Sequence, residues 1–170
     1  MDRRAFVASS MGVAVTSALS AAEQQSLHSR LLGVWSLTEA VTIKGNETLP
    51  WFGRRLPITG NLMYAESGWM SVQIAGAAPG TISRADFIKL PPADRVVWLD
   101  EYYAYYGTFE IDEVAHVVTH HVVNSLIPYE KATALKREVA IDRNILTLLT
   151  PPRDESGGRT FNRLVWKKAD

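Results

Sequence analysis

The chain has 170 residues, 46% of them hydrophobic, and its 18 basic and 18 acidic side chains give zero net charge. This length supports one domain with a substantial core. A neutral chain lacks the basic footprint that a nucleic-acid partner requires. The chain contains no Cys, which excludes thiolate nucleophiles, disulfides and Cys-based metal sites.

The N-terminal 22 residues have the features of an export signal. Arg3 and Arg4 precede a mildly apolar run over residues 7–19, and small residues follow up to Ala22. This order is typical of a cleaved signal, and the paired arginines favour the twin-arginine type. The apolar run is too short to span a bilayer. We therefore expect a periplasmic or secreted protein, with an ordinary amphipathic helix as the alternative.

The first half of the chain contains three segments with the pattern of strands, at residues 31–43, 59–65 and 69–75. In the third segment Met70, Val72 and Ile74 alternate with more polar neighbours, which indicates a strand with one apolar face. Residues 45–58 hold two Pro and two Gly and are expected to form a loop.

Two helices are expected next. Ser83, with Asp86 three positions later, predicts a short helix that ends near Leu90. Pro92 fits the first turn of a second helix, which is expected to continue to Tyr106 with Gly107 as its terminating residue. The apolar and aromatic stripe of this helix is either its buried face or the inner face of a lid over a pocket; it consists of Leu99, Tyr102, Tyr103 and Tyr106.

A hairpin over residues 107–128 and three strands at 133–141, 145–149 and 159–167 complete the chain. About eight strands in hairpin order predict a mainly all-β domain over residues 23–170. The expected fold is an eight-stranded antiparallel β-barrel with a helical insertion, and a sandwich is the alternative. A barrel of eight strands has room for one small ligand.

The hairpin carries three of the four histidines. With a turn near Glu113, Thr119 and His121 lie on a polar face, whereas His120 lies on a mostly apolar face. Side-chain parity alone leaves open which face lines the interior. In this register Glu110 lies about 13 Å from His121, so the two are not expected to form an acid–base pair.

Metal binding is not expected in this hairpin. His120 and His121 are adjacent on a strand, so they point to opposite faces and do not chelate one ion together. No third ligand stands at a convincing spacing. Arg137 interrupts an apolar face of the next strand, and it is either an arginine at the barrel rim or a buried cation for a carboxylate.

Several segments match the motifs of one known family. Gly33 and Trp35 form a Gly-x-Trp pair at the start of the first expected strand, and Arg163 lies in the last one. This arrangement resembles the lipocalins, in which the Trp closes one barrel end and the last-strand arginine packs on it. Over residues 31–167 the chain is similar to the lipocalin-like domain proteins of bacteria and fungi. The matching motifs are Trp51-Phe52-Gly53, Gly60-x-Leu62-x-Tyr64, Gly68-x-Met70-Ser71-x-Gln73, Tyr105-Tyr106-Gly107-Thr108-Phe109, Thr119-His120-His121-Val122, Ser125-Leu126-x-Pro128, Thr147-Leu148 and Pro151-Pro152.

The chain departs from that family after Pro128, where it reads Tyr129-Glu130-Lys131-Ala132 instead of an aromatic residue and a Gly. The resemblance implies the barrel more firmly than any activity, since a fold does not determine its chemistry. Carriers of apolar molecules and cofactor-free cyclases or isomerases both use related barrels.

Two functions follow as hypotheses, and neither needs a cofactor. The first is an exported barrel that binds a small apolar or aromatic molecule. The second is a cofactor-independent isomerase, cyclase or lyase that uses His121 as acid or base in the barrel cavity. The candidate ligand-binding residues are Gln73, Tyr102, Tyr106, Thr119, His121 and Arg137. The sequence leaves the oligomeric state open.

Overall fold

The structure is a computed structural model, and it describes residues 26–78, 80–156 and 158–169. The predicted export signal at residues 1–22 lies outside these described residues. No helix in the described part of the chain is long and apolar enough to cross a membrane.

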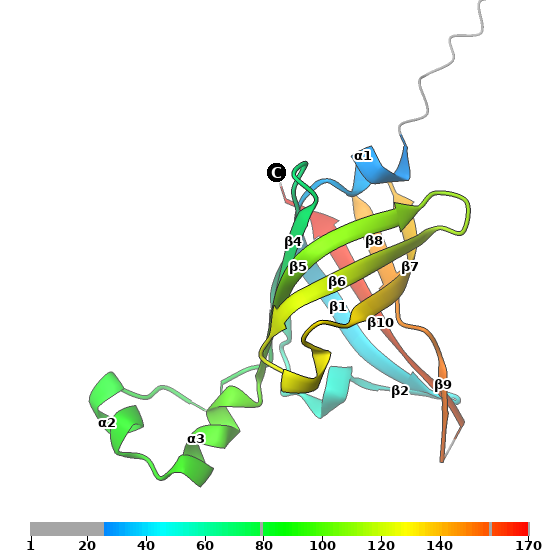
Figure 1. Ribbon diagram of the computed structural model, residues 1–170. Coiled ribbons are helices and arrows are strands. Elements are labelled where there is room, and N and C mark those ends of the chain that lie inside the picture. Colours follow the sequence, from blue (N-terminus) through cyan, green and yellow to red (C-terminus); the bar gives the residue numbers. More distant parts are fainter. Residues whose placement is uncertain (1–25, 79, 157, 170) are drawn as a thin grey trace, which may run out of the picture.

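The described strands form one antiparallel sheet that closes into a barrel (Figure 1). The closed ring contains eight strands, because β1 pairs with both β3 and β10. In ring order they are β1 (Gly33–Lys44), β3 (Thr59–Tyr64), β4 (Trp69–Ala75), β5 (Tyr102–Asp112), β6 (Val117–Ser125), β7 (Ala134–Asp142), β8 (Ile145–Leu149) and β10 (Gly158–Lys168). The short strands β2 (Glu47–Pro50) and β9 (Arg153–Glu155) extend the edges of β1 and β10. The predicted eight-stranded antiparallel barrel is confirmed.

One end of the barrel is closed by helix α1 (Leu27–Leu31) (Figure 1). The Trp35 ring is fully buried beneath this helix, and its indole N–H donates to the carbonyl of Leu31 at 2.8 Å. The Glu113 carboxylate, in the turn between β5 and β6, accepts hydrogen bonds from the first amides of α1. The exposed Glu113 carboxylate and the buried Trp35 indole thus hold the helix on the barrel end from two sides.

The cation that covers Trp35 is Lys168 and not Arg163. The Nζ atom of Lys168 lies 5.2 Å from the centre of the Trp35 ring. In the pairing of β1 with β10, Trp35 stands opposite Lys168, whereas Arg163 stands opposite Val41 and binds Glu39 on the outer face. The predicted packing of Arg163 on Trp35 was therefore wrong, because the register places Arg163 too far along the strand.

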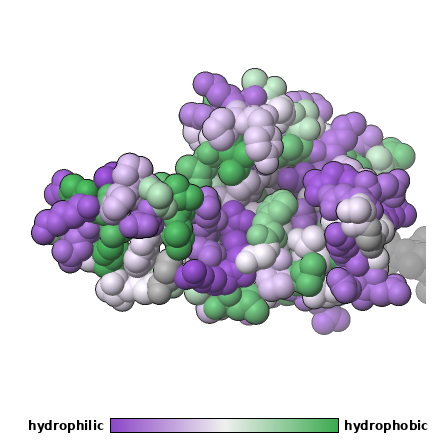
Figure 2. Space-filling model, turned by 90° about the horizontal axis from the view of Figure 1, so that it is seen from below, coloured by the Kyte–Doolittle hydropathy of each residue, from purple (hydrophilic) through white to green (hydrophobic). Residues whose placement is uncertain are grey.

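The helical insertion projects from the barrel as an arm made of α2 (Arg84–Lys89) and α3 (Pro92–Leu99) (Figure 1). Neither helix has a buried residue. Apolar side chains therefore lie on the arm surface, as Figure 2 shows; they include Ile88, Val96, Val97 and Leu99. The base of the arm is held by the Glu101 carboxylate, which lies 3.5 Å from the Arg55 guanidinium.

The second helix ends at Leu99, and residues Tyr102–Asp112 form strand β5. The prediction of a helix up to Tyr106 was therefore wrong. The aromatic spacing is compatible with the period of a helix and with that of a strand. Tyrosines favour strands, however, and β5 pairs with β4 and β6. In a strand the side chains alternate, so Tyr103 and Tyr105 point inward while Tyr102 and Tyr106 are exposed.

The pairing register of β5 and β6 differs from the predicted register by two positions. The Asp112 carboxylate accepts hydrogen bonds from the amides of Val114 and Ala115, which centres the turn one residue later than expected. Thr108 therefore pairs with His121. Glu110 and His121 become diagonal neighbours on the outer face and lie 3.1 Å apart. The expectation that these two residues are too distant to interact was wrong.

Candidate ligand-binding site

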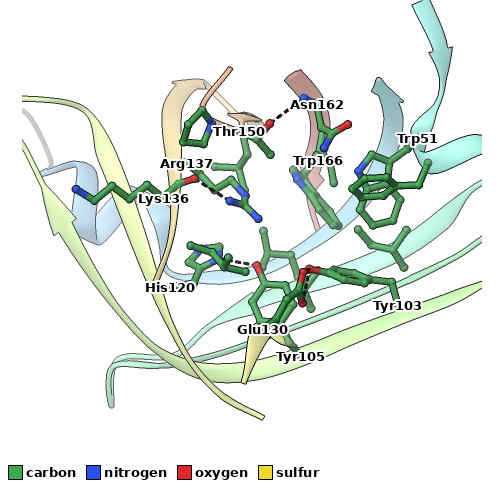
Figure 3. Close-up of a pocket in the computed structure, with 18 of the residues that line it drawn as sticks. Trp51, Tyr103, Tyr105, His120, Glu130, Lys136, Arg137, Thr150, Asn162 and Trp166 are labelled. Carbon is green, nitrogen blue, oxygen red and sulfur yellow. Dashed lines mark hydrogen bonds between the residues drawn. The ribbon is translucent and has the colours of Figure 1, made fainter. Parts of the chain in front are cut away.

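The barrel contains a cavity of about 310 Å³ at the end opposite α1 (Figure 3). Two short 3-10 turns border it, η1 (Trp51–Gly53) and η2 (Pro128–Glu130). The wall is mostly apolar, and its large apolar members are Trp51, Phe52, Leu62, Val72, Ile74, Tyr103, Leu135, Leu148, Leu164 and Trp166. The inward positions of the strands supply these side chains because every second residue of a barrel strand faces the interior.

His120 lies between the cavity and the core of the barrel. It is only 1% exposed, and both of its ring nitrogens are engaged. Nδ1 lies 2.6 Å from the Tyr105 hydroxyl, and Nε2 lies 2.7 Å from the Tyr64 hydroxyl. Tyr105 and His120 line the cavity, whereas Tyr64 lies deeper, in edge contact with Phe109.

These three side chains are neutral near pH 7. Burial lowers the pKa of His120 well below 6.5, and Arg137 and His121 add to this effect. Burial also raises the pKa of Tyr64 strongly and that of Tyr105 to about 12. The chain Tyr64–His120–Tyr105 is therefore a hydrogen-bonded network of uncharged groups.

The direction of the hydrogen bonds in this network follows from the acceptors that are present. A neutral imidazole has one N–H and one acceptor nitrogen. The buried Tyr64 hydroxyl has no other partner among the described residues, so its proton is satisfied only if it donates to Nε2. His120 then donates from Nδ1 to the Tyr105 oxygen, and the Tyr105 proton remains free to point into the cavity.

Arg137 extends from β7 toward the same region of the cavity (Figure 3). One of its terminal nitrogens donates to the carbonyl of Lys136 at 2.7 Å. No carboxylate of the described residues lies within ion-pair distance of its guanidinium. The remaining donors of the guanidinium are thus available to a molecule in the cavity.

The Glu130 carboxylate closes one side of the cavity. It accepts hydrogen bonds from the Tyr103 hydroxyl at 3.0 Å and from the Ser125 hydroxyl at 2.8 Å. Burial raises the pKa of Tyr103, and the neighbouring Tyr105 and the Glu130 carboxylate raise it further, so Tyr103 remains a donor. These bonds attach η2 to strands β5 and β6.

A cluster of aromatic rings continues the wall from Tyr103 toward η1. Trp51 meets the Tyr103 ring edge to face, with ring centres 5.2 Å apart. The Arg54 guanidinium lies over the Trp51 ring at 4.6 Å. This geometry is typical of cation–π contacts and holds η1 against the barrel.

Of the six residues predicted to bind a ligand, only Arg137 lines this cavity. His121 lies on the outer face beside Glu110, with 45% of its side chain exposed. His120, and not His121, is the histidine of the pair that reaches the interior. The other four predicted residues do not line the cavity either: Gln73 and Tyr102 border a shallow outer groove, Tyr106 lies near Trp69, and Thr119 belongs to the outward positions of β6.

The residues that sequence reasoning missed are His120, Tyr105, Trp51, Glu130 and Trp166. A signal for Tyr105 was present, since reading residues 102–112 with period two places it on the same face as Phe109. His120 was assigned to the apolar face, and that face proves to be the inner one. No local pattern marks Glu130, which reaches the cavity from a turn.

Metal ligands do not gather in this site. The described residues contain no group of three His, Asp or Glu side chains placed to hold an ion. Both nitrogens of His120 are bound to tyrosines, so they are not free to coordinate a metal.

A family model described as a lipocalin-like domain matches residues 32–169. The chain belongs to the lipocalin-like domain family. The matched region includes all eight strands of the closed ring and both 3-10 turns at the cavity. A comparison with curated proteins found no match. The cavity is therefore the interior of a lipocalin-like barrel, the place where a barrel of this size can hold one small ligand.

Proposed function

We propose that this protein binds a small, largely aromatic molecule in the cavity of its barrel. The observation that carries this proposal is the cavity itself, an apolar chamber of about 310 Å³ with a few polar groups that converge on it. Sites of this kind bind organic ligands because the apolar wall supplies affinity and the polar groups fix the orientation.

The size and lining of the chamber limit the ligand. Pockets for drug-sized molecules have volumes of about 300–1,000 Å³, so this one is at the small end. Trp51, Tyr103 and Trp166 offer flat aromatic surfaces to the ligand. A body of one or two fused rings fits these features best.

Native mass spectrometry of protein purified from its host tests the proposal. We expect a bound small molecule that is absent from the variant Leu135→Trp, in which an added indole occupies the cavity. Val123→Trp is the matched control because Val123 is exposed on the outer face. A ligand that remains in Leu135→Trp, or a wild-type protein that has only its bare mass, would contradict the proposal.

A second candidate function is catalysis of proton transfer without a cofactor. It is favoured by the hydrogen-bonded network of Tyr64, His120 and Tyr105, which ends at a hydroxyl in the cavity. His121 is not part of this candidate because it lies on the outer face. The binding function is favoured by the lowered pKa of His120, which makes it a weak base, and by the raised pKa of Tyr105, which makes it a weak acid near pH 7.

Deuterium incorporation into 2-acetylnaphthalene, followed by NMR in D2O, distinguishes the two functions. An enzyme would exchange the methyl protons faster than buffer does, and Tyr105→Phe would abolish that gain. A binding protein would leave the exchange rate at the level of buffer.

We also propose that the protein is exported through the twin-arginine route. Support comes from Arg3 and Arg4 ahead of the apolar run at residues 7–19. Cell fractionation and N-terminal sequencing should find the protein outside the cytoplasm, beginning after Ala22. Replacing both arginines by lysine should keep it in the cytoplasm, and unchanged export of that variant would contradict the proposed route.

A further inference from the structure

Arg137 carries a positive charge in a cavity that is otherwise largely apolar. Its guanidinium donates to the carbonyl of Lys136 and lies beside the Tyr105 hydroxyl, and no carboxylate of the described residues lies within ion-pair distance of it. A partly buried cation without a counter-ion is costly. A negatively charged ligand offsets the free-energy cost of the unpaired cation, whereas a neutral ligand does not.

Tyr105 adds a neutral donor beside this cation. Its hydroxyl oxygen accepts the N–H of His120, so its own proton is free for an acceptor in the cavity. Arg137 and Tyr105 therefore both present donors to the cavity, and Figure 3 shows the guanidinium pointing toward the space beside His120 and Tyr105. Two donors that converge in an apolar chamber are suited to an oxygen atom with negative charge.

The other charged groups near the cavity do not cancel its preference for a negatively charged ligand. The Glu130 carboxylate is held by the hydroxyls of Tyr103 and Ser125. Arg153 lies 3.3 Å from Glu155, and the Lys136 side chain extends away from the cavity in Figure 3. Arg54 is stacked on Trp51. Arg137 is thus the cation that remains for a ligand among these groups.

We propose that the ligand is a small aromatic carboxylate whose acid group is held by Arg137 and Tyr105 while its ring lies against Trp51 and Trp166. This inference rests on the proposed function and adds the chemical class of the ligand. The arginine is suited to a carboxylate because its planar fork offers two parallel N–H donors.

Isothermal titration calorimetry with 2-naphthoate and 2-naphthamide at neutral pH tests the inference. The two probes share ring system and shape and differ in charge. We expect the wild-type protein to bind the carboxylate about tenfold or more tightly than the amide, since hydrogen bonds to charged groups are worth more than neutral ones.

Variants of Arg137 and Tyr105 test whether these two residues cause the preference for the carboxylate over the amide. Arg137→Met should bind both probes equally, whereas Arg137→Lys should keep part of the preference for the carboxylate. Tyr105→Phe should weaken naphthoate binding severalfold, and it serves as an independent variant if Arg137→Met does not fold. Arg159→Met is the matched control, since it removes an exposed arginine from β10 and should keep the full preference.

The possible outcomes separate the two proposals. Equal affinity of the wild-type protein for both probes, or a full preference that survives in Arg137→Met, would overturn the inference and leave cavity binding intact. Binding of neither probe, or equal binding to Leu135→Trp, would overturn the proposed function together with the inference.

Discussion

The Nδ1 atom of His120 lies 2.6 Å from the hydroxyl oxygen of Tyr105, and this contact connects the core of the barrel to its cavity. Tyr64 completes the connection from the side of the core. The buried Tyr64 hydroxyl thus has His120 as its partner among the described residues, and the Tyr105 hydroxyl is oriented by the same imidazole. This dependence makes His120 important for stability as well as for the polarity of the cavity.

His120→Phe should lower the free energy of unfolding by about 2 kcal/mol, because it leaves the buried Tyr64 hydroxyl without a partner and removes one hydrogen bond of Tyr105. The neighbouring variant His121→Gln is the control. It removes only an exposed contact with Glu110 and should change stability by less than about 1 kcal/mol. Urea unfolding measures both values, and equal effects of the two variants would contradict the assignment of inner and outer faces.

Stability should decrease as the pH falls below about 6.5, and His120 should contribute to that decrease. Burial lowers the pKa of His120 in the folded protein, while in the unfolded chain its pKa is near the ordinary 6.5. The unfolded chain therefore binds a proton that the folded protein does not, and stability is lost as the pH falls toward the folded pKa.

The contribution of His120 to the free energy of unfolding changes by at most about 1.4 kcal/mol per pH unit. Urea unfolding between pH 7.5 and pH 5, compared with His120→Gln, isolates it. The wild-type protein should lose more stability over this interval than the variant. Parallel pH profiles would show that His120 has an ordinary pKa in the fold.

Glu113→Ala should loosen the helical plug while leaving the barrel folded. The amides of His28 and Leu27 donate to this carboxylate, and these hydrogen bonds lower its pKa. The cap is therefore complete above the ordinary carboxyl pKa and is lost as the pH falls through the lowered value.

Hydrogen exchange of the α1 amides reports on this cap. We expect faster exchange in Glu113→Ala at neutral pH, with no change in β8. Glu110→Ala is the control, because that carboxylate lies on the outer wall beside His121. Unchanged exchange in α1 would show that the capping contacts do not hold the helix.

Replacing residues 80–99 by a short Gly-Ser linker should leave the barrel and its cavity intact. No residue of α2 or α3 is buried, so the arm adds little to the core. The expected change in the free energy of unfolding is below about 1 kcal/mol, and naphthoate affinity should be unchanged. A large loss of affinity would show that the arm covers the cavity when ligand is bound.

The sequence predicted the barrel because its strand signals are local. The strands are determined by alternating apolar residues and by the turn residues between segments. In β4, for example, the alternating residues Met70, Val72 and Ile74 are the buried ones. The segment around Tyr102 was misassigned because its aromatic spacing satisfies both the helical and the strand period. Pairing with β4, a tertiary effect, decides between the two.

The site was predicted less well than the fold. Only Arg137 was recognised among the polar groups at the cavity, because it interrupts an apolar alternation. The choice between His120 and His121 depends on which hairpin face points inward, and periodicity does not specify that. Glu130 and Trp51 reach the cavity from turns, where the side-chain direction depends on the three-dimensional path of the chain.

A crystal structure of the protein with bound 2-naphthoate would show both where the ligand binds and which residues hold its carboxylate. We expect the naphthyl ring inside the barrel between Trp51 and Trp166, with the carboxylate at Arg137 and Tyr105. A cavity without the ring, and a ring bound instead on the outer face beside Trp69 and Tyr106, would contradict the proposed binding site.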